Sequence, residues 1–494
     1  MSVRVEKNML HIFNPATGED IDSIESTSPD QINSILNTAS LKSKEYNQAS
    51  FYERTKNINR LRKGLVSKLE EFIDIICKET GKKYEEGLTE ILTSVEYMKY
   101  AVKIMPKALK PEKRKTGVLF NKRASVFYEP YGVAGIISPW NYPLILTVTP
   151  ITEALLAGNT VVIKPSEQTP LTVRLLKELW DSCSNDPDLL QVVYGCGDVG
   201  HSIVSSSKTN VICFTGSSNV GQKIAETCAS LLKPAILELG GKDPMIIFND
   251  ANMNRAADAA IWGGMSNAGQ TCTSVEKIYI EESYKTNFIN LLKERIENLK
   301  TGPNENDHIG AITVENSKNK IISQIEEAKQ TSEVFEGPIS NNHNGWFIPP
   351  TLILDPPENS KVMQEETFGP VISIQSFNNE KDLLNKINNH NVYGLSASIF
   401  TKDKNKARRI GKAIPTGTIN VNDVLSHYGV SDLPFGGVGR SGLGRVHGKE
   451  GLRSFSRIKS LLENSFTLGP ELWWYHKKEL YIKLVKKFIK FYYK

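Results

Sequence analysis

Residues 211–221 read Val211-Ile-Cys-Phe-Thr-Gly-Ser-Ser-Asn-Val-Gly221. The apolar run from Val211 to Phe214 predicts a short buried strand, and the small residues after it predict a tight turn that opens a helix. Strands that lead through such turns into helices build parallel α/β sheets. The helix start could also hold a pyrophosphate, because its N–H groups are unpaired. The alternative is a tight turn that binds nothing.

The same alternation extends to both sides of this stretch. Further strands are predicted at Gly132–Ile137, Thr160–Ile163 and Ala235–Leu239, and in a second block over about 260–420 at Lys277–Ile280, Ser396–Phe400 and Thr418–Val421. Thr169-Pro170 predicts a helix start with proline at the first helical position. The pattern as a whole predicts an α/β fold with a doubly wound parallel sheet.

Three segments depart from this alternation. Residues 25–106 carry apolar side chains at helical spacing and predict helices. Residues 109–123 are rich in lysine and arginine and precede a predicted strand, which indicates an exposed hairpin where domains or subunits meet. The Asn-rich stretch near 385–391 is predicted as a surface connection.

Length and composition narrow the class of protein. The chain of 494 residues is too long for one hydrophobic core, so we expect two or three domains. Its six cysteines lack paired spacing, which favours free thiols in a reducing compartment and predicts no metal site. The N-terminus lacks the apolar core of a secretory signal, so a cytoplasmic protein is expected.

Three short stretches carry the residue types of thioester chemistry. Asn267-Ala-Gly-Gln-Thr-Cys272 places a thiol after a flexible loop, although a free cysteine is more often a buried apolar residue. Glu238-Leu-Gly-Gly-Lys242 places a carboxylate at the end of a predicted strand, and Pro139-Trp-Asn-Tyr-Pro143 places an amide on a rigid turn. Thiol, carboxylate and amide could serve as nucleophile, base and oxyanion donor.

Two further stretches are candidates for nucleotide binding. Lys164-Pro-Ser-Glu167 follows a predicted strand, where a carboxylate could accept ribose hydroxyls; the alternative is a solvated Lys–Glu pair. Gly195-Cys-Gly-Asp-Val-Gly200 matches a GxGxxG pattern. It is the weaker candidate for the phosphate site, because the expected acidic residue about 20 positions later is not convincing.

At these residues the sequence resembles the aldehyde dehydrogenase superfamily. The resemblance runs from about Phe13 to about Lys459 and rests on blocks that occur in the family's order. The blocks are Pro139-Trp-Asn-Tyr-Pro143, Lys164-Pro-Ser-Glu167, Phe214-Thr-Gly-Ser217, Glu238-Leu-Gly-Gly-Lys242, Gly269-Gln-Thr-Cys272, Glu365-Glu-Thr-Phe-Gly-Pro370 and Pro434-Phe-Gly-Gly437 with Ser441-Gly442.

The resemblance implies an α/β, aldehyde dehydrogenase-like fold: a Rossmann-type cofactor domain, an α/β catalytic domain and a small β oligomerisation element. The implied segments are 1–108 (first part of the cofactor domain), 109–130 (oligomerisation hairpin), 131–239 (second part of the cofactor domain), 240–423 (catalytic domain), 424–462 (return to the cofactor domain and oligomerisation strand) and 463–494 (basic tail). It also implies a homo-oligomer, with a dimer favoured and a tetramer possible.

The resemblance further implies a role for each site residue. Cys272 would attack an aldehyde, Asn141 would hold the oxyanion, and Glu238 would activate the water that releases the acid. NAD would be the cofactor, with NADP possible. Its implied contacts are Trp140, Lys164, Glu167, Gly216, Ser217, Ser218, Asn219, Val220, Gly221, Leu239, Glu366 and Phe368.

At two positions this sequence departs from the family pattern, and there the family's residue roles are not carried over to this chain. Many members carry a lysine nine positions after the oxyanion asparagine, where this chain has Pro150, so no proton relay is carried over from that lysine. Near Gly448 an acidic residue of some members is shifted or replaced by Lys449 and Glu450.

Asn141-Tyr-Pro and Pro150 resemble the branch that handles medium- and long-chain or aromatic aldehydes. A CoA-dependent acylating enzyme would lack Glu238, and a non-catalytic relative would lose the site residues.

The C-terminal tail carries the net charge of the chain. Residues 471–494 contain seven lysines and two glutamates and account for the formal charge of +5, so the body is neutral and nucleic-acid binding is not expected. As a helix, the tail would separate aromatic and aliphatic residues from lysines, behind Trp473-Trp-Tyr475. This pattern predicts peripheral attachment to the inner face of a membrane; the alternative is a helix that packs on the partner subunit near the substrate entrance.

Overall fold

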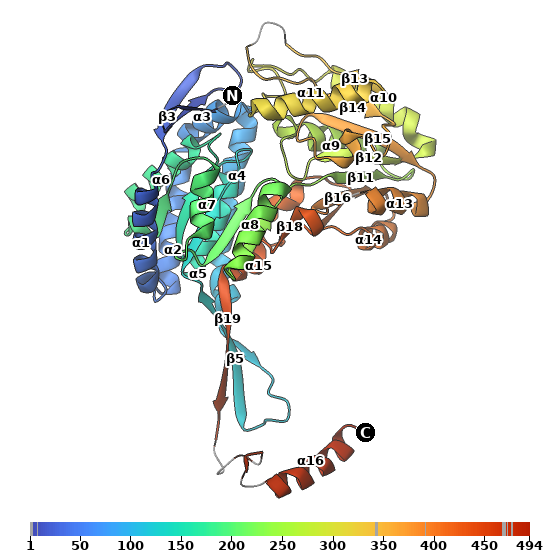
Figure 1. The fold of residues 1–494 in the computed structure, drawn as a ribbon. Helices are drawn as coiled ribbons and strands as arrows, with labels where there is room; N and C mark the ends of the chain where they lie inside the picture. Colours follow the sequence, from blue (N-terminus) through green and yellow to red (C-terminus); the bar gives the residue numbers. More distant parts are fainter. Residues whose placement is uncertain are drawn as a thin grey trace.

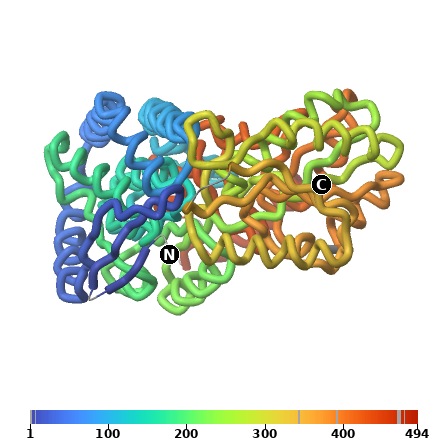
Figure 2. Tube along the Cα trace, turned by 90° about the horizontal axis from the view of Figure 1, so that it is seen from above, coloured from blue at the N-terminus to red at the C-terminus, as the bar shows by residue number. Residues whose placement is uncertain are grey.

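The protein forms two α/β lobes side by side, with an arm that extends away from them (Figures 1 and 2). The computed structural model describes residues 3–6, 8–340, 344–390, 392–466, 471, 473–475 and 478–494. Within these residues, no helix is both long and apolar enough to cross a membrane. The predicted α/β class is confirmed.

The first lobe is built on a six-stranded sheet of order β18-β10-β9-β6-β7-β8. Its strands are β6 (Val133–Ile137), β7 (Thr160–Lys164), β8 (Leu190–Val192), β9 (Val211–Thr215), β10 (Ala235–Glu238) and β18 (Gly442–Leu443). Five of them pair in parallel, whereas β18 joins β10 antiparallel. The carboxyl ends of β7, β9 and β10 therefore meet at one edge, where parallel sheets bind ligands.

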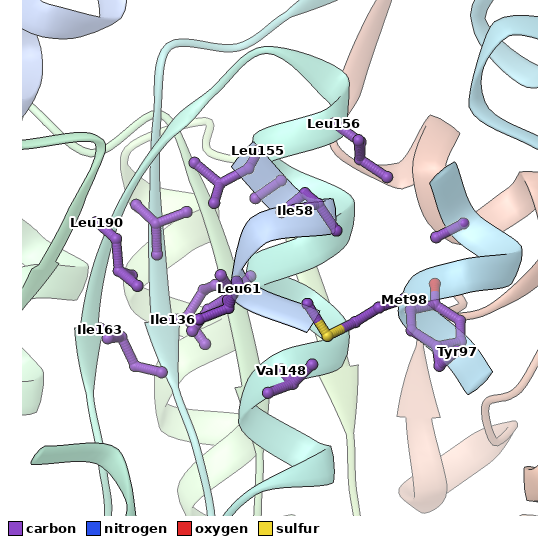
Figure 3. Close-up of a cluster of buried hydrophobic side chains, with 14 of the residues drawn as sticks. Ile58, Leu61, Tyr97, Met98, Ile136, Val148, Leu155, Leu156, Ile163 and Leu190 are labelled. Atoms are coloured by element: carbon purple, nitrogen blue, oxygen red, sulfur yellow. The ribbon is translucent and has the colours of Figure 1, made fainter. Parts of the chain in front are cut away.

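The helices of this lobe precede and alternate with its strands. They are α1 (Pro29–Tyr46), α2 (Phe51–Ser67), α3 (Leu69–Thr80), α4 (Tyr84–Leu109), α5 (Ile145–Ala157), α6 (Leu171–Cys183), α7 (Gly197–Ser205), α8 (Ser218–Ser230) and α15 (Gly448–Ser454). Pro170 is the N-cap of α6 and not its first residue, one position from the prediction. Figure 3 shows the core of the lobe, where Ile58 and Leu61 from α2 meet Val148 and Leu155 from α5.

The second lobe is built on a seven-stranded sheet of order β13-β14-β15-β12-β11-β16-β17. Its strands are β11 (Asp243–Ile247), β12 (Val275–Glu281), β13 (Glu333–Glu336), β14 (Thr351–Leu354), β15 (Val371–Phe377), β16 (Ser396–Phe400) and β17 (Thr418–Val421). Its helices are α9 (Met253–Met265), α10 (Lys285–Glu297), α11 (Glu315–Lys329), α12 (Lys361–Gln364), α13 (Glu380–His390) and α14 (Lys404–Ala413). The Asn-rich stretch near 385–391 was thus wrongly predicted as a loop up to residue 390, and residue 391 lies outside the described residues.

The arm consists of three antiparallel strands, and a separate small sheet lies at the N-terminus. In the arm, β5 (Lys122–Pro130) pairs along its whole length with β19 (Ser456–Asn464), and β4 (Glu112–Arg114) adds to the other side of β5. The N-terminal sheet holds β1 (Val3–Glu6), β2 (Met9–Phe13) and β3 (Asp20–Glu25). The predicted exposed hairpin is therefore present as an arm (Figure 1).

The C-terminal helix α16 (Lys478–Tyr492) lies beyond the arm, apart from both lobes (Figure 1). None of its residues is buried. Glu471, before the helix, is tied to the arm by an ion pair with Lys122 and a 3.1 Å hydrogen bond from Asn121. The predicted helical tail is present, with its apolar and basic side chains both exposed.

Candidate active site

Cys272 lies at the end of a strained loop between the two lobes. The loop follows α9 and includes a short 3-10 helix, Ser266–Gly269, in which Asn267, Ala268 and Gly269 have φ of 54°, 53° and 73°. A Cβ atom on Gly269 would lie 2.0 Å from the carbonyl oxygen of Gly369, so only glycine fits there. Left-handed backbone at non-glycine residues is costly and is often found at functional sites.

Hydrogen bonds from both lobes hold this loop in place. The Asn267 N–H donates to Glu86 on α4 at 2.5 Å, and its side-chain amide donates to the Asn141 carbonyl at 2.9 Å. The Gln270 side chain donates to the Asn267 carbonyl at 2.9 Å and accepts the Thr313 N–H at 2.8 Å. The loop that carries Cys272 is therefore held from both lobes.

Asn141 lies beside this loop and is itself held by a buried ion pair. Its side-chain amide donates to the Gln270 carbonyl at 2.9 Å. Its own carbonyl accepts from Lys82 at 2.9 Å, and Lys82 pairs with Glu90 at 2.8 Å, with both side chains fully buried. Glu90 also accepts the Leu144 N–H at 2.7 Å, at the start of α5. The amide of Asn141 is thus preorganised, with a second N–H hydrogen available.

Two cavities meet at Cys272. The smaller, of about 250 Å³, is lined by Glu238, Asn141, Trp140, Glu366 and Phe368 among others. The larger, of about 840 Å³, runs along α4, α5 and α9. Cys272 lines both cavities, so two molecules, one in each cavity, would lie next to each other at the thiol.

Glu238 ends β10 and faces the smaller cavity. It is 4% exposed, and neither carboxylate oxygen has a hydrogen-bond partner among the described residues. Burial raises the pKa of Glu238 well above its ordinary value, against the opposing charge of Arg445. Burial, followed by the carboxylates of Asp243 and Glu366, also raises the pKa of the Cys272 thiol, which is neutral as it stands.

Two aromatic rings and a second acid also line the smaller cavity. The rings of Trp140 and Phe368 meet edge to face at 5.4 Å. Glu366 accepts the Gly241 N–H at 3.1 Å, and burial raises its pKa to about 7. A Cβ atom on Gly240 would lie 2.3 Å from the Glu366 carboxylate, so a larger residue there would displace this side chain.

A second buried ion pair positions the segment that carries Glu366 and Phe368. Glu276 on β12 accepts the N–H groups of Thr367 at 2.9 Å and Phe368 at 3.0 Å, and it pairs with the buried Lys242. Four charged residues that support the site were missed in the sequence: Lys82, Glu86, Glu90 and Glu276. Only Glu276 could have been noticed, because it is a charged residue inside an apolar strand.

The remaining predicted residues lie along the same sheet edge. Lys164 at the end of β7 pairs with Glu167 at 2.8 Å, and although burial opposes it, this ammonium lowers the pKa of Glu167. Ser217 caps α8, and a Cβ on Gly221 would lie 2.4 Å from the Leu239 side chain. Gly216, Ser217 and Leu239 line the smaller cavity. Ser218, Asn219, Val220 and Gly221 continue from it into α8, and residues 195–200 line neither cavity.

Comparison with known proteins assigns this architecture. A sequence model of the aldehyde dehydrogenase family matches residues 3–461. The chain belongs to the aldehyde dehydrogenase family. The resemblance seen in the sequence blocks is therefore confirmed over nearly the whole chain, and the protein is an enzyme of the class that acts on aldehydes.

Relatives within the aldehyde dehydrogenase family differ in the aldehyde that they are named for. A 4,4'-diapolycopene aldehyde oxidase from Methylomonas sp is 35% identical over 86% of this chain and 80% of its own length. A chloroplastic betaine aldehyde dehydrogenase from Atriplex hortensis is 31% identical over 95% of both chains. A betaine aldehyde dehydrogenase from Staphylococcus aureus, crystallised with NAD+, has a TM-score of 0.89 at 29% identity over 95% of this chain and 96% of its own.

Proposed function

We propose that this aldehyde dehydrogenase oxidises an apolar, long-chain aldehyde to its carboxylic acid through a thioester on Cys272, with NAD(P)+ as oxidant. The main support is the position of the Cys272 thiol, which lies where two cavities meet, between a preorganised amide and a buried carboxylate. The smaller cavity suits a nicotinamide and the larger one an aldehyde. This is the arrangement that hydride removal from a covalent adduct requires.

The chain's own residues divide the reaction into two halves. The Cys272 sulfur bonds to the aldehyde carbon, and the Asn141 amide donates to the oxygen that becomes negative. After oxidation, Glu238 takes a proton from water, whose oxygen attacks the thioester carbon as the carbon–sulfur bond breaks. Burial raises the pKa of Glu238, so its ionised carboxylate is a stronger base for this proton than an exposed one would be.

The cofactor side fits a dinucleotide. Gly216 and Ser217 offer the N-terminus of α8 to a pyrophosphate, and Glu366 and Phe368 frame the space beside Cys272. Lys164 and Glu167, at the end of β7 on the same sheet edge, would hold the adenosine ribose. When bound, the oxidised nicotinamide accepts the hydride and adds positive charge near the thiol, which favours the thiolate.

The larger cavity favours a neutral apolar aldehyde over a cationic one. Its lining includes Ile261, Trp262 and Leu299, and its volume of about 840 Å³ suits a long chain. Four carboxylates line it. Glu86, Glu90 and Asp258 are already paired with donors of the protein, and Glu85 is exposed. The three paired carboxylates have little capacity left for a cationic substrate. The relative named for diapolycopene aldehyde supports the same substrate class.

A panel of saturated aldehydes of increasing chain length tests this substrate class. The value of kcat/KM should rise by about threefold to fourfold for each methylene group that enters the cavity, because burial of each contributes about 0.8 kcal/mol. Betaine aldehyde is the matched cationic probe. Equal kcat/KM for short and long aldehydes, or a preference for betaine aldehyde, would contradict the proposal.

Assembly and membrane attachment complete the proposal. We infer a homodimer, or a tetramer, joined through the arm, because the apolar residues Ile458 and Leu462 of β19 are 70% and 59% exposed in a single chain. The segment boundaries set out above for the cofactor, catalytic and oligomerisation parts are proposed with it. We also infer that α16 lies on an anionic membrane surface, because its aromatic and aliphatic side chains are exposed beside its lysines.

A further inference from the structure

A cluster of buried polar side chains adjoins Glu238 and has no part in the steps above. It contains Glu153 on α5, Tyr97 on α4 and His447 just before α15. These three residues are 0%, 1% and 1% exposed. Burial of an acid and an imidazole costs free energy unless hydrogen bonds compensate for the lost contact with water.

The three side chains form one contiguous group. The Tyr97 hydroxyl donates a hydrogen bond to Glu153, and the His447 backbone N–H donates to the same carboxylate oxygen at 2.7 Å. The Tyr97 and His447 rings stack at 4.5 Å, and the Tyr428 ring lies 4.6 Å from His447 on another side. Figure 3 shows Tyr97 on α4 at the edge of the apolar core.

Several polar atoms of this group have unused hydrogen-bonding capacity. The second carboxylate oxygen of Glu153, both ring nitrogens of His447 and both oxygens of Glu238 have no partner among the described residues. Buried polar atoms are nearly always paired, through water where no protein group reaches them. Their concentration in one place fits a chain of hydrogen bonds that includes water.

The group reaches the catalytic centre at one end. Tyr428 lies among Cys272, Glu153 and Glu238, close enough for their charges to act on its hydroxyl. Thr149, one helical turn before Glu153 on α5, lines the smaller cavity together with Glu238 and Tyr428. Glu153 is therefore close enough to Glu238 for a charge on it to raise the pKa of Glu238.

The other end of the group reaches the protein surface. The Tyr97 and Tyr100 rings lie 6.4 Å apart on α4. The Tyr100 hydroxyl donates to Asp432, which is exposed, and Glu450 lies close enough to act on the same hydroxyl. A sequence of titratable groups thus runs from the site to solvent.

The reaction supplies protons that need such a route. This step rests on the proposed function: an aldehyde and water become a carboxylate, the hydride goes to NAD(P)+, and two protons are left over. Cys272 gives up a proton when it bonds to the aldehyde and takes one back when the thioester breaks, so both leftover protons come from the water. During turnover, cofactor and substrate would occupy the two cavities beside Cys272, and the buried Glu238 would then have little contact with solvent.

We propose that Glu153, with Tyr97 and His447, carries these protons from Glu238 to the surface at Asp432. Burial raises the pKa of Glu153 to about 8, so it is protonated at neutral pH and can accept a proton on one oxygen as it releases one from the other. Burial lowers the pKa of His447 to about 3, so its ring is neutral and offers one donor and one acceptor.

The test compares Glu153→Gln with Glu79→Gln in the full-length enzyme. Glu79 on α3 is also fully buried, and burial raises its pKa to about 7, but it accepts the N–H groups of Leu171 and Thr172 at α6. Stopped-flow NADH formation with a saturating aldehyde gives the burst and the steady rate. In Glu153→Gln we expect a full burst and a kcat lower on the order of 10-fold to 100-fold, partly restored by added imidazole as a mobile proton carrier. Glu79→Gln and wild type should not respond to imidazole.

Two results would overturn the proton route. One is a kcat of Glu153→Gln equal to that of wild type; the other is a reduced kcat that imidazole leaves unchanged. If Glu153→Gln does not fold, Tyr97→Phe removes the same hydrogen bond and is judged by the same imidazole response. A wild-type enzyme that forms no NADH would overturn the proposed function itself, before any variant is compared.

Discussion

At the residue scale, the thiol of Cys272 is a weak nucleophile in the protein without its cofactor. Burial and nearby carboxylates keep it neutral, so the protein alone protects it from reaction. A bound nicotinamide would add positive charge on the side of the smaller cavity. The thiol would then become reactive only when the oxidant is in place, which limits side reactions of the aldehyde.

The Lys82–Glu90 pair gives a prediction for stability. Lys82→Met should lower the free energy of unfolding by about 3–5 kcal/mol, because it leaves the Glu90 carboxylate buried without its counter-ion. Chemical denaturation measures this change. Lys78→Met is the matched control, since the Lys78–Asp74 pair is exposed and its loss should have almost no effect. Equal stability of Lys82→Met and wild type would contradict the assigned role.

Glu167 gives a prediction for the cofactor. NAD should be preferred over NADP in kcat/KM, because the Glu167 carboxylate would accept ribose hydroxyls and repel a 2′-phosphate. Glu167→Gln should narrow this preference, mainly by improving the KM for NADP. A wild-type kcat/KM for NADP equal to or above that for NAD would refute the assignment.

The predictability of the site depends on how far apart its parts lie in the sequence. Asn141, Glu238 and Cys272 could be singled out because each stands in a short stretch of unusual composition. Glu86 and Glu90 could not, because on a helix they look like ordinary solvated charges. Their partners lie far away in the sequence: Glu90 accepts the N–H groups of Leu144 and Ile145 at the start of α5, and the contact of Glu86 with Asn267 spans 181 residues.

At the element scale, strands were more predictable than the ends of helices. The strand expected at 211–214 extends through Thr215, and the other predicted strands shift by a few residues at most. Strands β11, β14 and β15 of the second sheet were not predicted from the sequence. The Asn-rich segment near 385–391 is mostly helix α13 because Leu383 and Ile387 are buried on one face, 0% and 2% exposed. Burial of that face outweighs the local preference of asparagine for loops.

The C-terminal tail gives a specific prediction for membrane binding. Deletion of residues 471–494 should abolish co-sedimentation with vesicles that contain phosphatidylserine while leaving kcat on short soluble aldehydes unchanged. Each lysine near such a surface contributes about 1 kcal/mol, and the apolar face adds a term that salt does not screen. High salt should therefore weaken binding without removing it.

A matched variant separates the charge of α16 from its apolar face. Replacing Lys483, Lys486, Lys487 and Lys490 with glutamine should remove the salt-sensitive part of vesicle binding and retain the helix. If the full-length enzyme does not co-sediment with anionic vesicles, the membrane proposal is wrong. A truncated enzyme with an altered KM would then point to contact with the partner subunit.

At the scale of the whole molecule, the arm predicts association. A strand as long and exposed as β19 presents unpaired edge groups and apolar side chains, which soluble proteins normally cover. Light scattering should give the mass of a dimer or a tetramer at micromolar concentration. Ile458→Lys should shift the population towards the monomer. A stable wild-type monomer would contradict this assembly.

The covalent intermediate is tested most directly by intact-mass measurement of Glu238→Gln. This variant should form the thioester but release it slowly, because water is no longer activated. After incubation with NAD+ and a long-chain aldehyde, we predict an added mass equal to the aldehyde minus two hydrogen atoms, located on the peptide that contains Cys272. The double variant with Cys272→Ala should show no adduct. An unmodified Glu238→Gln protein that nevertheless forms NADH, or an adduct on another residue, would contradict the account.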